Sequence, residues 1–452
     1  MSPTFDHSLY SERRKELASL LGPDSVAIIP TSSEQPRNRD SDYLFRHDSY
    51  FYYLTGFTEP NACLVLFANG DSTLYCQPKD LEREIWDGYR LGPEEAIHTL
   101  GVTHARSFAE IDSHLPVLLE NTNSVWYPFA IHKGLTERID HWLRSVQAKS
   151  RSGISAPQQL RNVCTLLDEM RLIKDAHEID LMKKAALISA QAHLKAMQFC
   201  GSSFRDNKPI CEYHLDAEIL YEFRRHGSEY PAYASIVASG SNACVLHYRA
   251  DKAPIKDGDL VLIDAGCEFA SYAGDITRTF PANGHYSKPQ RALYDVVLES
   301  QYAAISATRE GALFTDPHNA ALKVLAKGLL ELNILNANIH GGVEDVIENK
   351  HYFPYYMHRT SHWLGMDVHD CGSYSEPQAG DRGKTPTPRI LKAGMALTIE
   401  PGLYIRPAAH IPEAFHNIGI RIEDDAVVAK GGCELLSRDV PVDPLEIERL
   451  MS

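Results

Sequence analysis

Long hydrophobic runs are missing from the 452-residue sequence. No stretch approaches the roughly 20 consecutive apolar residues that a helix needs to cross a bilayer, and the charged N-terminal segment, 1–22, lacks the apolar core of a secretory signal. The sequence has no internal repeat, and its 28 glycines and 25 prolines are too few for a fibrous or disordered chain. We therefore expect a folded protein that does not bind membranes.

Positive charge and cysteine are also scarce. The 45 lysines and arginines stand against 60 aspartates and glutamates, a net charge of −15, which argues against a large basic surface and hence against nucleic acid as a partner. The nine cysteines are odd in number, scattered and without a C-x-x-C pair, a pattern typical of reduced thiols rather than of a disulfide framework. We expect a cytoplasmic protein.

The hydrophobic pattern changes along the chain and divides it in two. Up to about residue 150, short apolar runs alternate with helical patterns, which indicates an α/β domain. A Ser-rich segment with a glycine and a proline, 149–157, interrupts this pattern. Apolar residues then recur every three or four positions over 179–197, as on one face of a long helix. We expect an α+β chain with a smaller α/β N-terminal domain, 1–172, and a larger C-terminal domain, 173–452.

Two acidic residues accompany strand-like apolar runs in the C-terminal domain. Asp264 ends the run Leu260–Ile263, and Asp275 precedes the run Thr277–Phe280. A buried carboxylate without a partner is costly, so it needs a cation or strong hydrogen-bond donors beside it. A turn between the two runs would bring the acids face to face and indicate a metal site. The alternative is that Asp275 faces solvent and Asp264 caps the loop.

Three histidines, His358, His362 and His369, lie within a dozen residues among large apolar side chains. Imidazole is both a common metal ligand and the usual proton carrier near neutral pH. A single histidine in this setting is more often a core residue. Three clustered histidines instead indicate a function for at least one of them.

Two further acids end runs in which apolar residues alternate with polar ones. Glu400 shares a face with Thr398, and Glu423 shares a face with Arg421, opposite their apolar neighbours. Taken singly, Glu400 can be a solvated carboxylate before a turn, and Glu423 can form a surface ion pair with Arg421.

Together these stretches supply four carboxylates and one imidazole, from Asp264, Asp275, Glu400, Glu423 and His362. Two divalent ions neutralise four carboxylates, whereas one ion leaves an excess of negative charge in an apolar shell. Two-metal hydrolases hold their ions about 3.5–4 Å apart. Oxygen ligands with a single imidazole suit Mn²⁺, Co²⁺, Fe²⁺ or Zn²⁺. We therefore expect a site for two metal ions.

The order of these residues resembles a known family. It is similar to that of the pita-bread metallopeptidases, which include methionine aminopeptidase, prolidase and aminopeptidase P, and the motifs are most similar to bacterial aminopeptidase P. The segments that carry the resemblance are Val261–Glu268, Ser361–Gly365, Glu400–Tyr404 and Gly419–Asp425 in the C-terminal domain, with Arg37–Tyr43, Tyr53–Phe57 and Glu84–Gly88 in the N-terminal domain.

The resemblance implies a fold, a reaction and metals. The C-terminal domain would be a pita-bread catalytic domain. The chain would be a Xaa-Pro aminopeptidase, a hydrolase that removes the first residue of a peptide when proline is second. Its nucleophile would be a hydroxide that bridges two divalent ions per subunit, usually Mn²⁺. Its partners would be Xaa-Pro peptides and further copies of itself, in a homodimer or homotetramer.

The resemblance also implies a division of the metal ligands. Asp275 and Glu423 would bridge the two ions, and a bidentate Asp264 would complete the ligands of one ion. His362 and Glu400 would complete those of the other. Glu400 would also accept the proton of the bridging water.

Further residues match positions that act on the substrate in this family. Those that would orient the substrate, stabilise the transition state or protonate the leaving amine are His247, His358, His369 and Arg421. Those that would contact the substrate are Tyr404, Trp86 and Asp40. For Trp86 and Asp40, in the N-terminal domain, the alternatives are a packed indole and a turn carboxylate.

Two other functions share parts of the pattern. Prolidase has the same ligands but accepts only dipeptides, so it must hold a free carboxylate, for which Arg359 beside His358 is a candidate. A metal-free relative, either a creatinase-like C–N hydrolase or a binding protein, would have lost several ligands, whereas all five are present here. We therefore favour the aminopeptidase.

Overall fold

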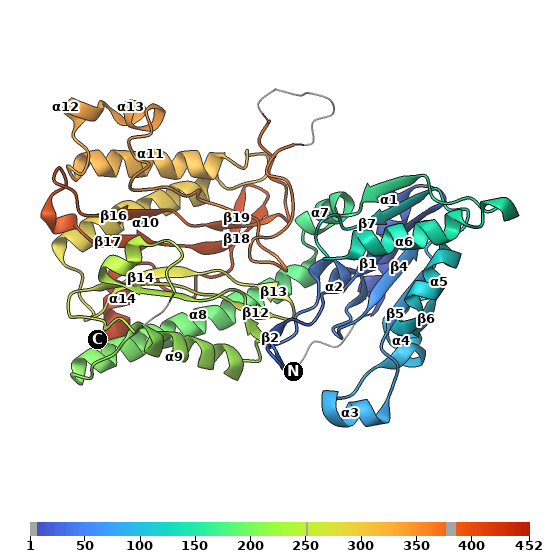
Figure 1. Ribbon diagram of the computed structural model, residues 1–452. Helices are drawn as coiled ribbons and strands as arrows, with labels where there is room; N and C mark the ends of the chain where they lie inside the picture. Colours follow the sequence, from blue (N-terminus) through green and yellow to red (C-terminus); the bar gives the residue numbers. More distant parts are fainter. Residues whose placement is uncertain (1–6, 250–251, 377–385) are drawn as a thin grey trace. The chain divides into compact units, whose positions relative to one another are not determined.

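The computed structural model describes residues 7–249, 252–376 and 386–452. The chain divides into two compact units, Met1–Met170 and Arg171–Ser452 (Figure 1). None of the described helices is both long and apolar enough to span a membrane. Each unit has its own hydrophobic core and is described on its own.

The N-terminal unit is built on a six-stranded mixed sheet with the strand order β6-β5-β4-β1-β7-β8. The central strand β1 (Ser25–Pro30) pairs antiparallel with β4 (Cys63–Phe67) and parallel with β7 (Ser124–Tyr127). The apolar run of β1 is buried on both faces, as in a strand that helices cover on both sides.

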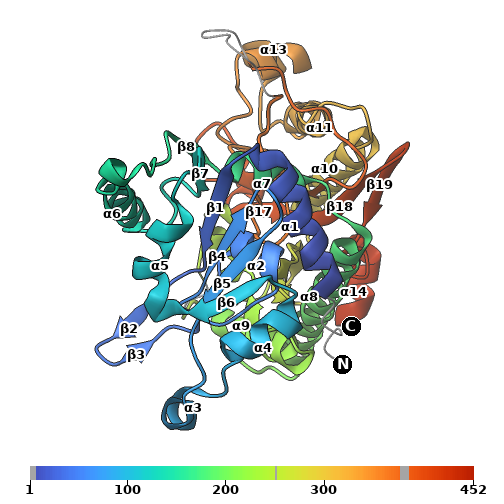
Figure 2. The ribbon, with the colours of Figure 1, turned by 90° about the vertical axis from the view of Figure 1, so that its right-hand side faces the viewer.

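Helices cover both faces of this sheet (Figure 2). On one side α1 (His7–Leu21) and α2 (Ser49–Thr55) contact β1 and β4. On the other side α5 (Ile111–Leu118) and α6 (Leu135–Gln147) share a core with β1 and β4. The remaining elements are β2 (Pro36–Asn38), β3 (Ser41–Asp42), β5 (Ser72–Cys76), α3 (Leu81–Asp87), α4 (Gly92–Leu100), β6 (His104–Ser107), β8 (Gln159–Asn162) and α7 (Cys164–Leu172), which ends in the second unit.

The C-terminal unit begins with α8 (Ala176–Arg205). The side chain of Asp175 accepts a hydrogen bond from the Glu178 amide, and the Glu178 carboxylate accepts one from the Asp175 amide, so a capping box starts the helix. The apolar stripe expected from the sequence packs inward, with Met182 and Met197 buried.

Small antiparallel sheets of this unit lie between two pairs of helices. Figure 1 shows the strands with α8 and α9 (Glu212–Arg225) on one side and α10 (Lys288–Ala307) and α11 (Asp316–Glu331) on the other. The remaining helices are α12 (Ala337–His340), α13 (Val343–Glu348) and α14 (Pro444–Met451).

The strands of the C-terminal unit form the sheets β10-β11-β14, β13-β12-β9, β15-β18-β19 and β16-β17. Their bounds are β9 Tyr230–Pro231, β10 Ile236–Ser239, β11 Leu260–Asp264, β12 Cys267–Phe269, β13 Tyr272–Ala273, β14 Thr277–Pro281, β15 Ala396–Ile399, β16 Gly402–Ile405, β17 Ile418–Arg421, β18 Asp424–Ala429 and β19 Gly432–Leu435. Asp264 ends β11, Glu400 directly follows β15, and Glu423 lies between β17 and β18. These strand ends meet, so the topology gathers carboxylates.

Candidate active site

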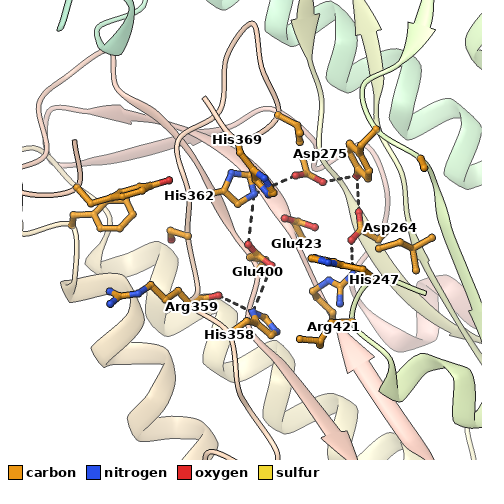
Figure 3. A pocket seen from close by; sticks show the side chains of 18 of the residues that line it. His247, Asp264, Asp275, His358, Arg359, His362, His369, Glu400, Arg421 and Glu423 are labelled. Atoms are coloured by element: carbon orange, nitrogen blue, oxygen red, sulfur yellow. Dashed lines mark hydrogen bonds and ion pairs between the residues drawn. The ribbon is translucent and has the colours of Figure 1, made fainter. Parts of the chain in front are cut away.

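A cavity of about 850 Å³ opens in the C-terminal unit where these strand ends meet (Figure 3). Apolar and aromatic side chains form part of its wall, while the charged and imidazole groups converge on one region of it. The predicted site residues that line it are His247, Asp264, Asp275, His358, His362, His369, Glu400, Arg421 and Glu423.

The hairpin between β11 and β14 sets the first two acids beside each other. Asp264 pairs with Thr277 across the two strands, and Asp275 lies two residues before Thr277. The two paired segments approach closely beyond the acids, because a Cβ on Gly266 would lie 1.7 Å from the Gly274 carbonyl oxygen. Glycine at 266 therefore permits the close backbone approach that places the two carboxylates on one wall.

Glu423 joins the two acids through the same threonine. Its amide donates to the Thr277 carbonyl, 3.1 Å away, in an isolated bridge between β14 and the segment that links β17 to β18. The Thr277 hydroxyl in turn donates to Glu423 Oε2 at 2.5 Å. Thr277 thus pairs with both Asp264 and Glu423, and Asp275 lies two residues before it. Backbone pairing at this threonine holds the three carboxylates near one another.

His362 and Glu400 come from two extended segments that lie side by side. The Thr398 amide donates to the His362 carbonyl (3.0 Å), and the Glu400 amide donates to the Thr360 carbonyl (2.8 Å). His362 Nδ1 donates to the Trp363 carbonyl at 2.9 Å. The other ring nitrogen, Nε2, then faces Asp275 Oδ2 at 3.4 Å and Glu400 Oε1 at 3.7 Å.

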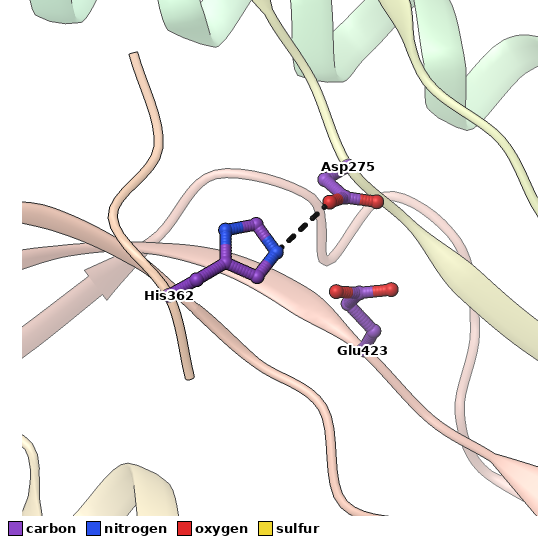
Figure 4. Close-up of side chains that lie close together, drawn as sticks. All are labelled: Asp275, His362 and Glu423. Carbon is purple, nitrogen blue, oxygen red and sulfur yellow. Dashed lines mark ion pairs between the residues drawn. The ribbon is translucent and has the colours of Figure 1, made fainter. Parts of the chain in front are cut away.

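This donor set fits divalent metal ions. Single ligand atoms of Asp275, His362 and Glu423 all lie within 4.8 Å of one another (Figure 4), and Asp264 and Glu400 flank them (Figure 3). The bond from His362 Nδ1 to a carbonyl leaves Nε2 as the ligand atom, the arrangement that orients metal-binding histidines. Oxygen ligands with one imidazole are a typical set for Mn, Fe, Co or Zn.

The electrostatics of the cluster also indicate a missing positive charge. Burial, followed by the neighbouring carboxylates, raises the pKa of Glu423 well above its ordinary value, and burial raises the pKa of Glu400 to about 7. Burial alone would lower the pKa of His362, but its hydrogen bond to Asp275 and the charge of Glu400 raise it to about 9. The acids lack sufficient countercharge from the chain itself, which divalent cations would supply.

A second network runs along the wall next to the acids. Arg421 forms an ion pair with Asp264 and donates to the Tyr404 hydroxyl at 2.9 Å. His358 Nδ1 donates to the Arg359 carbonyl, so its Nε2 accepts from the Tyr404 hydroxyl at 2.8 Å. Burial, and then Arg421, lowers the pKa of His358 to about 3. The imidazole of His358 is therefore neutral in this network at neutral pH.

His247 and His369 complete the group of imidazoles in the cavity. The His369 ring packs edge-on against His362, with ring centres 4.5 Å apart, and burial lowers the pKa of His369. The side chain of His247 is exposed in the cavity wall, just after the turn Gly240–Cys244.

Trp86 and Asp40 belong to the N-terminal unit and do not line the cavity of the C-terminal unit. Trp86 lies on α3 and is 84% exposed, and Asp40 is exposed in the turn between β2 and β3. The exposure of Trp86 excludes the packed indole considered from the sequence. A role for either residue at the site stays a prediction.

Two groups at the site escaped the sequence analysis. The Tyr233 hydroxyl lies 2.6 Å from Asp264 Oδ1 and 2.5 Å from Asp275 Oδ1, and both oxygens of Asp425 accept from the Asp275 amide. Asp425 lies two residues after Glu423 in the segment Gly419–Asp425, so the sequence already placed it near the proposed ligands. Tyr233 stands in a stretch with no periodic pattern, and only the tertiary structure reveals its role.

Comparisons with known proteins agree with this site. The model of metallopeptidase family M24 matches residues 180–430, and that of the aminopeptidase P N-terminal domain matches residues 10–126. The chain is 41% identical to the Xaa-Pro aminopeptidase of Escherichia coli over 446 residues, 98% of this chain and 97% of that protein.

Solved structures give the same result over nearly the whole chain. Aminopeptidase PepP of Pseudomonas aeruginosa matches with a TM-score of 0.93 and 44% identity, over 99% of this chain and 98% of that one. Zinc-substituted Escherichia coli aminopeptidase P in complex with product matches with a TM-score of 0.91 and 41% identity, with the same coverage. These matches confirm the predicted fold class, a pita-bread catalytic domain preceded by a smaller α/β domain. The chain therefore belongs to metallopeptidase family M24 and, within it, to the Xaa-Pro aminopeptidases of the aminopeptidase P type.

Proposed function

We propose that this protein removes the N-terminal residue from peptides whose second residue is proline. One observation carries the proposal: the five residues proposed as metal ligands, which lie far apart in the sequence, converge on one wall of a single cavity. The identity of the chain to Xaa-Pro aminopeptidases supports the same reaction. Residues 1–172 and 173–452 are proposed as the two domains, with the chemistry in the second.

The proposed site would hold two divalent ions, and Asp275 and Glu423 are the residues proposed to serve both of them. The two oxygens of Asp275 support this arrangement, since Oδ1 faces the side of Tyr233 and Asp264 while Oδ2 faces His362. Asp264 would bind one ion, and His362 with Glu400 would bind the other. Mn²⁺ is the proposed metal, as the family resemblance implies, and the ligand set suits it as it suits Co²⁺, Fe²⁺ or Zn²⁺.

Divalent ions at this position lower the pKa of water and polarise the scissile carbonyl. Glu400 lies beside His362 on the open side of the acid cluster and is proposed to accept the proton of the attacking water (Figure 3). Arg421 and Tyr404, joined by a hydrogen bond, are proposed to orient the substrate and stabilise the developing negative charge.

The leaving group places a further demand on the site. A Xaa-Pro bond is a tertiary amide without an N–H, so the departing proline is a secondary amine that must be protonated. His358 and His369 both line the cavity. His369 is proposed as the group that delivers this proton, because the one N–H of neutral His358 donates to the Arg359 carbonyl. His358 is instead proposed to orient the substrate. His247 is proposed to hold the substrate against the acid cluster.

The N-terminal unit is proposed to take part in assembly. The exposed side chains of Leu81, Ile85, Trp86 and Tyr89 form an apolar group on and just after α3. Apolar side chains gathered on a surface often mark an interface with another chain. A homodimer or homotetramer in the cytoplasm, in which Trp86 and Asp40 reach the substrate of a neighbouring copy, is the proposed assembly.

A direct test measures release of the first residue from Xaa-Pro-Xaa tripeptides, with metal content determined in parallel. We expect turnover that a chelator abolishes and that added Mn²⁺ restores. Xaa-Pro dipeptides are the control substrate, because Arg359 lies in the cavity wall and prolidase requires a free carboxylate there. Turnover of dipeptides with refusal of tripeptides would replace the aminopeptidase by a prolidase. Less than one metal ion per chain after supply of Mn²⁺, with no activity, would refute both.

A further inference from the structure

A buried carboxylate outside the metal cluster lies beneath the segment that carries His247. Glu212 is the first residue of α9, and its side chain is fully buried. Its Oε1 accepts hydrogen bonds from the Ser239 amide (2.8 Å), the Ser239 hydroxyl (2.9 Å) and Asn242 Nδ2 (2.9 Å). Its Oε2 accepts from the Tyr248 hydroxyl at 2.8 Å. One carboxylate thus holds both ends of the segment Ser239–Tyr248.

The rest of this segment is also held in place. Asn242 Nδ2 also donates to the Tyr248 hydroxyl (3.1 Å), and Arg406 donates to the Cys244 carbonyl (2.8 Å). A Cβ on Gly419 of β17 would lie 2.3 Å from the Ala243 carbonyl oxygen, so the turn packs directly on the strand that carries Arg421. The backbone before His247 is therefore fixed relative to the acid cluster.

His247 depends on this backbone for its position. Its side chain is exposed in the cavity, and it has no hydrogen bond or ion pair with another described residue. The preceding and following residues set the direction of the imidazole, and Tyr248 is the neighbour that Glu212 binds. A shift of this segment would move the imidazole away from the substrate.

We propose that Glu212, through its bonds to Ser239, Asn242 and Tyr248, is a positioning residue for His247 in peptide hydrolysis. These four residues are named the Glu212 clamp. The proposal rests on the proposed function only in assigning His247 to the substrate. Since a displacement of about 1 Å can cost about 100-fold in rate, loss of the clamp should slow turnover strongly without any loss of a metal ligand.

The test is a double-mutant cycle between Glu212→Ala and His247→Ala. We expect Glu212→Ala to lower kcat for a Xaa-Pro-Xaa tripeptide about 10- to 100-fold, with KM changed less and metal content unchanged. In the His247→Ala background, the same substitution should change kcat less than about twofold. Glu212→Gln keeps one carbonyl oxygen as an acceptor and should rescue part of the rate.

Glu222→Gln is the matched control. Glu222 is also buried, 3% exposed, and lies on the same helix, but its carboxylate pairs with Arg225 and His226 at that helix end. We expect the control to keep wild-type kcat. If Glu212→Ala does not fold, Glu212→Gln and Tyr248→Phe take its place in the cycle, with smaller decreases in the same direction.

Hydrogen exchange provides a readout that needs no turnover. Glu212→Ala should speed amide exchange within Ser239–Tyr248, where Ser239 loses its acceptor, and Glu222→Gln should leave it unchanged. Equal slowing by Glu212→Ala in the wild-type and His247→Ala backgrounds would overturn the proposal, as would unchanged exchange with kcat within twofold of wild type. A wild-type enzyme that cleaves no Xaa-Pro peptide would instead refute the proposed function, while faster exchange would still support the clamp.

Discussion

The two units bury charge in opposite ways. In the described part of the N-terminal unit the buried charged side chains are Arg13 and Arg14, and no carboxylate is buried. In the C-terminal unit the buried acids are Glu178, Glu212, Glu222, Glu268, Asp275, Asp370, Glu423, Asp424 and Asp425. The first unit places its buried cations against backbone. The second unit buries charges of both signs, and two of its buried acids, Asp275 and Glu423, line the cavity.

Arg14 shows how the N-terminal unit stabilises a buried positive charge. Its guanidinium donates to the carbonyls of Leu54 (2.8 Å), Leu100 (2.9 Å) and Gly101 (2.8 Å), at the C-terminal ends of α2 and α4. Helix C-termini have carbonyls without intrahelical partners and carry partial negative charge. The charge is therefore satisfied by the folded chain alone. Around Asp275 and Glu423 the chain does not achieve this, and the difference indicates where a ligand belongs.

The largest expected effect is the loss of turnover when an acid of the cluster is replaced. Asp275→Ala and Glu423→Ala should each lower turnover to under about 1% of wild type, because each removes a proposed bridging ligand. The metal-free variants should be at least as thermally stable as the metal-free wild type, since one of several crowded like charges is gone. Enzyme assay, metal analysis and thermal unfolding measure these outcomes. Activity above a few per cent would contradict the bridging role.

Asp370 offers a contrast within the C-terminal unit. Its carboxylate is buried but paired, with Arg171 Nη2 at 2.6 Å and Lys174 Nζ at 2.8 Å. Asp370→Ala should lower the free energy of unfolding by about 3–5 kcal/mol, because it removes the anion that faces buried Lys174 and leaves Arg171 with the partly exposed Asp367. In the control Asp295→Ala, which breaks an exposed pair with Arg291, we expect about 0–1 kcal/mol. Equal losses in denaturant titrations would show that burial does not set the cost.

Arg14→Ala tests how much the hydrogen bonds of this buried cation stabilise the N-terminal unit. Three carbonyls lose a charged donor, and the free energy of unfolding of this unit should fall by about 2–3 kcal/mol. Metal content should not change, because the proposed metal ligands lie in the other unit. Arg144→Ala, which removes an exposed pair with Asp140, is the control and should cost under about 1 kcal/mol. A decrease no larger than the control would mean that these carbonyls are satisfied without Arg14.

The smallest effect concerns pH and His47 of the N-terminal unit. Burial, with a contribution from Arg46, lowers the pKa of His47 from 6.5 to about 3. The folded state therefore binds this proton less readily than the unfolded state. Its contribution to stability is complete above pH 6.5 and is lost progressively as the pH falls toward 3, by about 1.4 kcal/mol per pH unit.

Thermal unfolding of wild type and His47→Gln between pH 7 and pH 5 measures this dependence. The wild-type midpoint should fall more steeply with decreasing pH than that of the variant. Parallel curves would show that His47 has the same pKa in the folded and unfolded protein. The sign of this effect distinguishes a buried neutral base from the acid cluster, whose crowded carboxylates lose repulsion when they are protonated.

Local patterns were sufficient for much of the fold and for the proposal of the metal ligands. The stripe of α8 and the acid that ends β11 follow from side-chain periodicity, which persists because helices and strands have fixed repeats. The family resemblance supplied the roles of Asp264, His362 and their partners, and the structure gathers all of them in one cavity. The roles of Trp86 and Asp40 stay predictions.

Other features had no local signal. Tyr233 meets Asp264 and Asp275 across 31 and 42 positions of sequence, and Glu212 meets Ser239 across 27. The helix and strand repeats of the sequence do not reveal either contact. An isolated tyrosine or glutamate is also more often at the surface than in a buried network. Their functions could not be separated from ordinary surface roles before the chain was folded.

By itself, the sequence determined which residues have the chemistry for a metal site and on which face of a strand or helix each one lies. The tertiary structure decided which of them meet, and it added the supports, Tyr233 beside the acids and Glu212 beneath the His247 segment. The physical reason is that periodicity is a property of neighbouring residues, whereas a hydrogen bond depends on where distant segments pack. The crowding of buried carboxylates appears only at that second level, and it supports the proposed position of the metal ions.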